Sequence, residues 1–104
     1  MCIRDRLSIE SALAYERIVD LVHIDVQGTE VDIVSSALPV LRDKVKCLVI
    51  GTHGREIEGQ LASILAEDGW RLCREQSCRL AQGAKEIACI VDGCQMWRNP
   101  RLFV

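Results

Sequence analysis

The chain has 104 residues, enough for one small domain and too few for two. Its 49% hydrophobic and 27% charged residues exclude a disordered chain. The formal net charge of −2 leaves no basic field for nucleic acid or an anionic membrane, and no apolar run approaches the roughly 20 residues of a membrane-spanning helix. Because no secretory signal is visible either, we expect a soluble, cytoplasmic protein.

The first six residues, MCIRDR, differ abruptly from the sequence that follows. They resemble the translated end of an adapter used in sequencing libraries. We therefore expect residues 1–6 to be a non-native leader and residues 7–104 to be a partial domain whose natural chain continues upstream. The alternative is a genuine N-terminal segment.

The hydrophobic pattern predicts helices that alternate with strands. Apolar residues three or four positions apart predict helices, and short continuous apolar runs predict buried strands. In chain order we expect a helix over residues 8–17, a strand over 20–26, a helix from Gly28 or Thr29, a strand over 45–50, a helix over 55–68, a strand over 70–75, a loop over 77–84, and strands over 86–91 and 95–98. Such alternation indicates a parallel sheet covered by helices.

Three local signals sharpen this prediction. Pro39 is expected to break or kink the second helix near Ala37, because proline lacks the N–H that a helix interior needs. Gly69 is placed to cap the third helix. The dipeptide Asp92-Gly93 is a strong signal for a two-residue hairpin, so the last two strands should pair with each other.

Six cysteines are many for so short a chain. Two pairs share the spacing Cys-x4-Cys, at 73/78 and 89/94, which is looser than in most zinc knuckles. Most of the cysteines lie in apolar runs, where free cysteine acts as a small hydrophobe. We expect neither a metal site nor a disulfide framework, with zinc as the alternative. In the strand over 70–75, Trp70, Leu72 and Cys73 should point inward.

Polar residues follow two of the predicted strands where each strand ends. Asp25 and Gln27 follow the first of them, and His53 follows the second. The carboxyl ends of neighbouring parallel strands share one edge of a sheet, where ligands bind. We expect Asp25 and His53 to lie a few ångströms apart there, as a base or substrate orienter and a proton-sharing partner. The alternatives are that Asp25 caps the next helix and that His53 bonds only to backbone.

Three further residues carry weaker signals. Glu30 suits the first turn of a helix as a charge on its dipole, and could instead contact a substrate or a metal. Gln27 could hydrogen-bond a substrate or the edge of a cofactor. His23 shares a strand face with Asp25 but lies inside an apolar run, so we expect a buried, hydrogen-bonded histidine.

Three segments together resemble one known family. IDVQGTE at 24–30, GTHG at 51–54 and DGCQMWRNPRL at 92–102 resemble the FkbM family of methyltransferases, which are class I S-adenosylmethionine-dependent enzymes. The family's usual phrase is Ile/Val-Asp-Val-Glu-Gly-Ala-Glu. Asp25, Gly28 and Glu30 match it, whereas Gln27 and Thr29 depart from it. The resemblance covers roughly residues 7–102.

The resemblance implies an α/β fold: the C-terminal half of a Rossmann-like class I methyltransferase sheet, with parallel strands, helices and an antiparallel edge hairpin. It implies O-methylation of a sugar or small metabolite, with Asp25 and His53 as catalytic residues and Gln27 and Glu30 in contact with substrate. The glycine-rich loop that cradles S-adenosylmethionine in such enzymes is absent from this sequence. The cofactor is therefore expected for the parent protein, and its binding residues are unknown.

Two other expectations remain open. A stand-alone α/β interaction or nucleotide-binding domain, with structural Asp25 and His53, would share the fold without the chemistry. If upstream strands are missing, the strand over 20–26 has an unpaired edge, and such an edge favours self-association. The expected partner is otherwise a small-molecule substrate.

Overall fold

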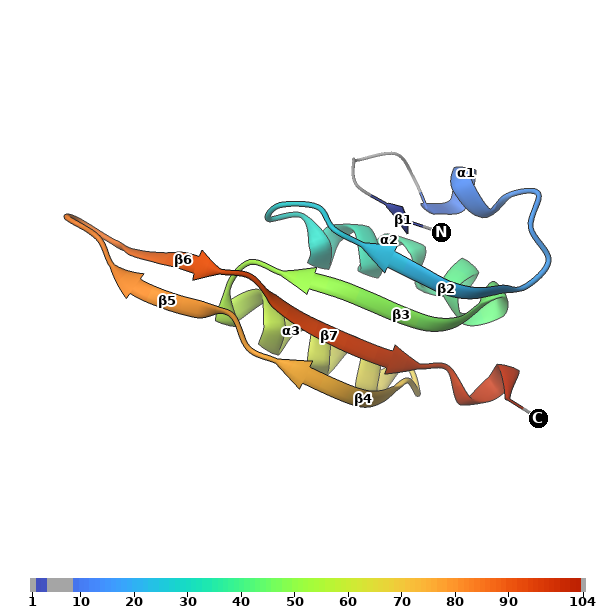
Figure 1. The fold of residues 1–104 in the computed structure, drawn as a ribbon. Helices are drawn as coiled ribbons and strands as arrows, with labels where there is room; N and C mark the ends of the chain where they lie inside the picture. Colours follow the sequence, from blue (N-terminus) through green and yellow to red (C-terminus); the bar gives the residue numbers. More distant parts are fainter. Residues whose placement is uncertain (1, 4–8, 104) are drawn as a thin grey trace.

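The computed structural model describes residues 2–3 and 9–103, which form a mixed α/β fold (Figure 1). The five-stranded sheet has the order β1-β2-β3-β7-β4. β1, β2 and β3 are parallel, and β7 runs antiparallel to both β3 and β4. Helices α2 and α3 lie on one side of this sheet. The bounds are β1 Cys2–Ile3, α1 Ile9–Leu13, β2 Val19–Ile24, α2 Glu30–Lys44, β3 Val45–Thr52, α3 Arg55–Glu67, β4 Arg71–Gln76, β5 Arg79–Gln82, β6 Ile87–Val91 and β7 Gly93–Arg98, followed by a 3-10 turn, η1, at Pro100–Leu102.

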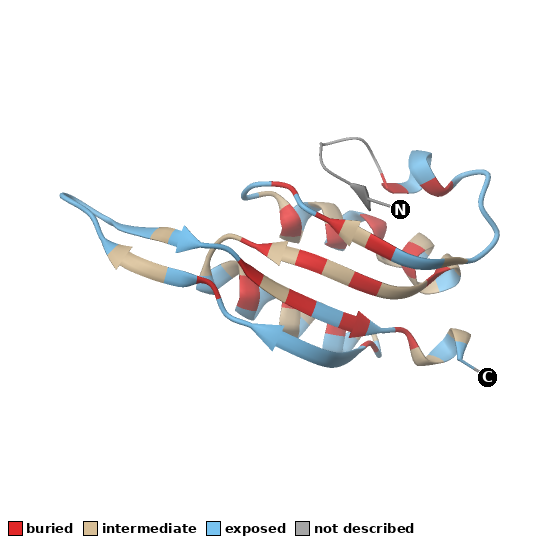
Figure 2. Ribbon diagram, in the orientation of Figure 1, coloured by how far each residue is buried: buried red, intermediate tan, exposed pale blue. Residues whose placement is uncertain are grey.

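The parallel pair β2–β3 forms the centre of the sheet, as the sequence predicts. Val22 pairs with Leu48 and Ile24 with Ile50, and all four side chains are fully buried beneath the helices. Burial alternates along β3 and β7, with every second residue facing the helix layer (Figure 2). Two parallel strands in this register bring their carboxyl ends to one edge, which we call the rim.

Helix α2 does not break at Pro39, so the predicted break is wrong. The helix runs on to Lys44 with Pro39 inside it and exposed. Ala37 and Leu41, on either side, are buried in the core. The burial of this apolar face outweighs the backbone hydrogen bond that proline cannot make, since helix stability in proteins comes mostly from packing.

The first predicted helix is shorter than expected, because α1 ends at Leu13. Its two buried residues, Ile9 and Leu13, join the core. The ammonium of Lys44 donates to the carbonyl of Leu13 at 2.8 Å, which closes the end of α1 against the end of α2. Helix α3 matches its prediction within one residue, and Gly69 follows it with φ +90°, a conformation that favours glycine.

The C-terminal strands form one long hairpin, and this corrects two predictions. β4 and β5 run outward, β6 and β7 return, and the turn lies at 83–86, where the N–H of Gly83 donates to the carbonyl of Glu86 at 2.7 Å. There is no hairpin at Asp92-Gly93: β6 leads into β7 along the same line (Figure 1). The predicted loop over 77–84 contains β5. We call β5, β6 and their turn the arm.

The structure also corrects the prediction for the strand over 70–75, because this strand lies at the edge of the sheet. Trp70 is buried as predicted, but Leu72 is 45% exposed and Cys73 is exposed too. β4 lies at the edge of the sheet, its residues are exposed along its whole length, and its register with β7 shifts between Leu72 and Arg74. A strand in that position has too little covering it to bury inward-pointing side chains.

The backbone of β1 pairs with β2 in parallel, with Cys2 opposite His23 and Ile3 opposite Ile24. The edge of β2 expected to be unpaired therefore has a partner at these two residues. The expected boundary between residues 6 and 7 and the expected start of the first helix at residue 8 lie outside the described residues. Among the described residues, no helix is both long enough and apolar enough to cross a membrane.

Candidate functional site

Asp25 and His53 lie side by side on the rim. Asp25 follows the last residue of β2, and His53 follows the last residue of β3. Oδ1 of Asp25 is 3.9 Å from Nε2 of His53. The carboxylate side chain of Asp25 is 46% exposed and the imidazole is 12% exposed. The two groups can thus face one ligand, while their catalytic roles stay predictions.

The alternative role for Asp25, as a helix cap, finds no support in the backbone. Helix α2 begins at Glu30, and its N-cap residue is Thr29. The Thr29 side chain makes no capping hydrogen bond, although its carbonyl accepts from the N–H of Ile33 at 3.1 Å. Asp25 lies on the rim before this turn and faces His53.

Glu30 holds the other side of the imidazole. Its Oε1 lies 2.6 Å from Nδ1 of His53, and its side chain is fully buried. Gly28 makes this possible: with φ +84° it turns the chain from β2 into α2, and its N–H donates to the same Oε1 at 3.2 Å. An ionised carboxylate only accepts hydrogen bonds. Glu30 therefore favours the neutral His53 tautomer that carries its proton on Nδ1 and leaves a lone pair on Nε2.

The second carboxylate oxygen of Glu30 takes no part in this contact. Oε2 is buried and has no hydrogen-bond partner among the described residues. Buried polar atoms are nearly always hydrogen-bonded, so such an atom marks a place where a further group belongs. The sequence suggests Glu30 as a substrate contact, but the structure places it beneath His53, and its substrate role stays a prediction.

Asp92 is a member of the site that the sequence does not reveal. Its Oδ2 lies 3.4 Å from Nε2 of His53, and its side chain is 61% exposed. The Asp92-Gly93 dipeptide is typical of a hairpin turn, and only the insertion of β7 beside β3 brings it to the rim. No local pattern could have predicted a contact that depends on this strand order.

Glu58 of α3 anchors the segment that leads from β4 into the arm. Glu58 accepts hydrogen bonds from the Thr52 hydroxyl at 2.6 Å, the Ser77 hydroxyl at 2.8 Å and the Cys78 N–H at 2.8 Å. Burial raises the pKa of Glu58, but these hydrogen bonds outweigh it and the pKa lies below the usual 4.5. A cluster of Thr52, Glu58, Ser77 and Cys78 thus joins β3, α3 and the root of the arm.

Gly93 shows how tight this anchor is. A Cβ on Gly93 would collide with the carboxylate of Glu58 and the hydroxyl of Thr52, and would lie 2.6 Å from the backbone nitrogen of Cys78. Only a residue without a side chain fits between them. The residue directly after Asp92 is therefore tightly enclosed.

The sequence also singles out two other residues, Gln27 and His23. Gln27 is exposed on the loop between β2 and α2, where it is free to meet a ligand that approaches the rim. His23 is half-buried, on the same strand as Asp25. It is less enclosed than expected of a core histidine.

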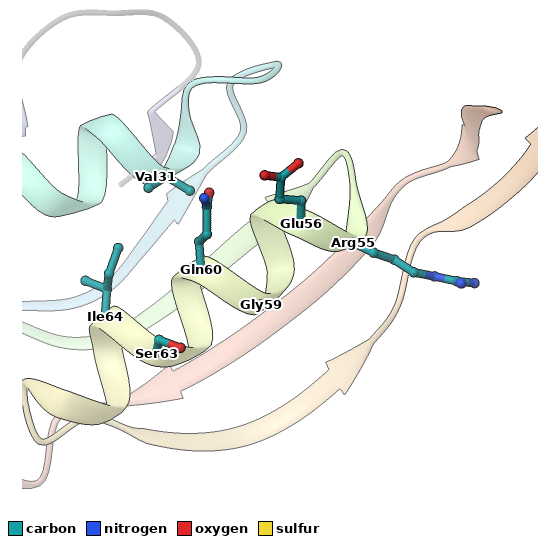
Figure 3. Close-up of a pocket in the computed structure, with 7 residues that line it drawn as sticks. All are labelled: Val31, Arg55, Glu56, Gly59, Gln60, Ser63 and Ile64. Atoms are coloured by element: carbon teal, nitrogen blue, oxygen red, sulfur yellow. The ribbon is translucent and has the colours of Figure 1, made fainter. Parts of the chain in front are cut away.

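The larger hollows lie between helices α2 and α3. A groove of about 490 Å³ is lined by Val31 of α2 and by one face of α3, and Arg55 at its end points away from it (Figure 3). A second hollow of about 420 Å³ lies further along the same two helices. Neither is lined by Asp25, Gln27 or His53.

Among the described residues, no group of three or more His, Cys, Asp or Glu side chains is arranged to hold a metal ion. The five cysteines whose side chains the structure describes are free thiols. Cys78 is buried, and burial together with nearby Glu58 raises the pKa of its thiol, which disfavours the reactive thiolate. Cys47, Cys89 and Cys94 are half-buried and Cys73 is exposed, so only Cys78 is a fully buried hydrophobe.

Comparison with known proteins gives one informative similarity. The chain is 37% identical over 92 residues to a protein of Jannaschia sp. (strain CCS1) named "Putative methyltransferase". The match covers 86% of this chain and 32% of that protein, so the chain spans about a third of the relative's length. No protein-family profile matches the chain, and no solved structure matches it.

Proposed function

We propose that this chain is part of an S-adenosylmethionine-dependent methyltransferase that methylates a hydroxyl oxygen of a sugar or small metabolite. The observation that carries the proposal is the buried Glu30–His53 pair at the carboxyl ends of two adjacent parallel strands. It leaves one imidazole nitrogen at the rim, where an acceptor hydroxyl can reach it. The similarity to the Jannaschia protein, through that protein's name, supports methyl transfer.

The strand order supports the finer assignment to an FkbM-type domain. The parallel strands β2 and β3 and their helices α2 and α3 agree with the C-terminal half that the resemblance implies, and the antiparallel pair β7–β4 lies on the side of the sheet where an edge hairpin is expected. Each of the three segments that carry the resemblance, 24–30, 51–54 and 92–102, contributes to the group around His53: Asp25 and Glu30 from the first, His53 itself from the second and Asp92 from the third. In this proposal the remaining part of the domain belongs to the longer parent protein.

The described residues do not by themselves form a cradle for S-adenosylmethionine. The hollows described above lie between α2 and α3, and the rim carries three carboxylates around one histidine. We therefore assign the cofactor to the parent protein and derive no step through it. The residues of this chain are assigned to the acceptor side of the reaction.

On the acceptor side, we assign a role to each residue. The acceptor hydroxyl donates a hydrogen bond to Nε2 of His53, and this nitrogen takes the hydroxyl proton. The Nδ1–H of His53 stays hydrogen-bonded to Glu30, whose carboxylate stabilises the imidazolium that forms. Asp25 accepts a hydrogen bond from a neighbouring group of the acceptor and orients it. Gln27 lies on the loop beside them and can bind the same molecule.

The test uses the protein expressed from its complete native gene. S-adenosylmethionine should bind in calorimetry, and His53→Gln should lower kcat at least a hundredfold with little change in KM, because a general base acts in the transition state. His23→Gln, on the same sheet, is the matched control and should leave kcat unchanged. Absence of S-adenosylmethionine binding would favour the interaction or nucleotide-binding alternative, and full activity in His53→Gln would remove the base role.

A further inference from the structure

The rim places one imidazole nitrogen between two carboxylates that come from different parts of the chain. Asp25 follows β2 and Asp92 precedes β7, and their oxygens lie 3.9 Å and 3.4 Å from Nε2 of His53. Both carboxylates are about half exposed or more, so they face whatever approaches Nε2. The third carboxylate, Glu30, lies beneath and is fully buried.

We infer that Asp92, together with Asp25, selects acceptors that are neutral or cationic beside the reacting hydroxyl and rejects anionic ones. The inference rests on the proposed function in one respect, namely that the acceptor reaches Nε2 of His53. It adds a residue, Asp92, and a charge class of substrate. Asp92 acts here as a specificity-determining and positioning residue.

The physical reason is that carboxylates accept hydrogen bonds from hydroxyl and ammonium groups and repel anions. Two unit charges about 5 Å apart in water change a binding constant about fourfold, and more where water is partly excluded. Two such carboxylates on either side of Nε2 therefore distinguish an ammonium from a carboxylate at the same position of a ligand. Hydroxyls next to the reacting one can bond to Asp25 and Asp92 at once.

Two observations show that this cluster is a built site. Gly93 is enclosed by Glu58 and Thr52, which fixes the backbone next to Asp92. The buried, unpartnered Oε2 of Glu30 lies in the same cluster, on the residue that holds His53. A carboxylate pair beside a base is suited to distinguishing the charge of a ligand, because both carboxylates lie close to the nitrogen that the ligand approaches, at 3.9 Å and 3.4 Å.

The experiment uses the 104-residue chain and three sugars of one size: methyl α-D-glucopyranoside (neutral), D-glucosamine (cationic) and D-glucuronate (anionic). The His53 ring resonances are followed by NMR during each titration. Glucosamine and the glucoside should shift them. For each carboxylate, glucuronate should bind about fourfold more weakly than the neutral glucoside and therefore about sixteenfold more weakly than glucosamine. Asp92→Asn should weaken the binding of glucosamine about fourfold and leave the affinity for the glucoside unchanged.

Asp20→Asn is the matched control, because Asp20 lies at the far end of β2, is 90% exposed, and loses the same charge away from the rim. It should leave all three affinities unchanged. An unchanged glucosamine-to-glucuronate ratio in Asp92→Asn overturns the inference, and so does a His53 ring that none of the sugars perturbs. If the charge ratio holds while the protein from the complete gene neither binds nor consumes S-adenosylmethionine, the proposed function fails and the charge selectivity stands.

Discussion

The Nδ1 atom of His53 lies 2.6 Å from Oε1 of Glu30, a carboxylate with no exposed surface. This contact sets which imidazole nitrogen faces the rim. Asp25 and Asp92 both lie near the opposite nitrogen, so they compete with Glu30 for the single proton of the neutral ring. The buried carboxylate has the shorter contact.

Removing that contact should change the tautomer. In Glu30→Leu, Asp25 and Asp92 are the remaining carboxylate acceptors, so we expect the proton of neutral His53 to move from Nδ1 to Nε2. Long-range ¹H–¹⁵N spectra at alkaline pH distinguish the two forms. Glu56→Leu, on an exposed position of α3, should keep the Nδ1–H form. A wild-type ring that already carries its proton on Nε2 would contradict the assignment.

Ionisation of Glu58 should make the stability of the fold depend on pH. Because the folded pKa of Glu58 is lowered below its usual 4.5, its contribution is present above that value and is lost as pH falls through the folded pKa. We expect urea midpoints to fall from pH 6 toward pH 3. Glu58→Gln should cost about 1–3 kcal/mol at neutral pH and should flatten this slope.

Exposed Glu67→Gln is the control for that series, and it should reproduce the wild-type slope. Asp68 contributes in the same direction, since burial raises its pKa but hydrogen bonds from Arg42 and Trp70 lower it further. Some slope should therefore remain in Glu58→Gln. A Glu58→Gln variant with the full wild-type slope would show that the cluster does not titrate.

Gly93 and Gly59 should respond oppositely to the same substitution. Gly93→Ala forces a Cβ against Glu58, Thr52 and Cys78, and overpacking of this kind costs about 1–3 kcal/mol. Gly59 lies in α3 with nothing within 4 Å of its Cβ position, so Gly59→Ala should stabilise by about 0.5–1 kcal/mol through helix propensity. Thermal unfolding of both variants measures this, and destabilisation by both would mean that the glycine environments are not as described.

Self-association through the edge of β2 stays a prediction, and β1 gives a way to test it. β1 pairs with β2 opposite His23 and Ile24, so deletion of residues 1–6 should bare that edge. We expect residues 7–104 to sediment as larger, concentration-dependent species than residues 1–104. Equal sedimentation of the two chains would show that the pairing does not protect the edge.

Local sequence predicts well the elements whose burial follows from periodicity. β2, α2, β3 and α3 appear in the expected places because their apolar positions repeat at strand or helix spacing. The proximity of Asp25 and His53 also follows from the sequence, because neighbouring parallel strands end at one edge. These predictions need only local pattern and one topological rule.

The remainder depends on contacts between distant segments. Whether Asp92-Gly93 turns or continues is decided by β3 and by Glu58, which are 34 or more residues away in the chain. Pro39 stays helical because its neighbours are buried, which propensity does not encode. Glu30 looks like a surface charge in sequence, and only the position of His53 shows why it is buried.

The place of β7 in the sheet has a consequence for biosynthesis. β7 lies between β3 and β4, yet it follows both of them in the chain, and it contributes the buried Trp97 to the core. The sheet therefore cannot close between β3 and β4 until the segment through β7 has left the ribosome. Until then β3 has one flank exposed to other nascent chains, and chaperone demand during synthesis should concentrate on that interval.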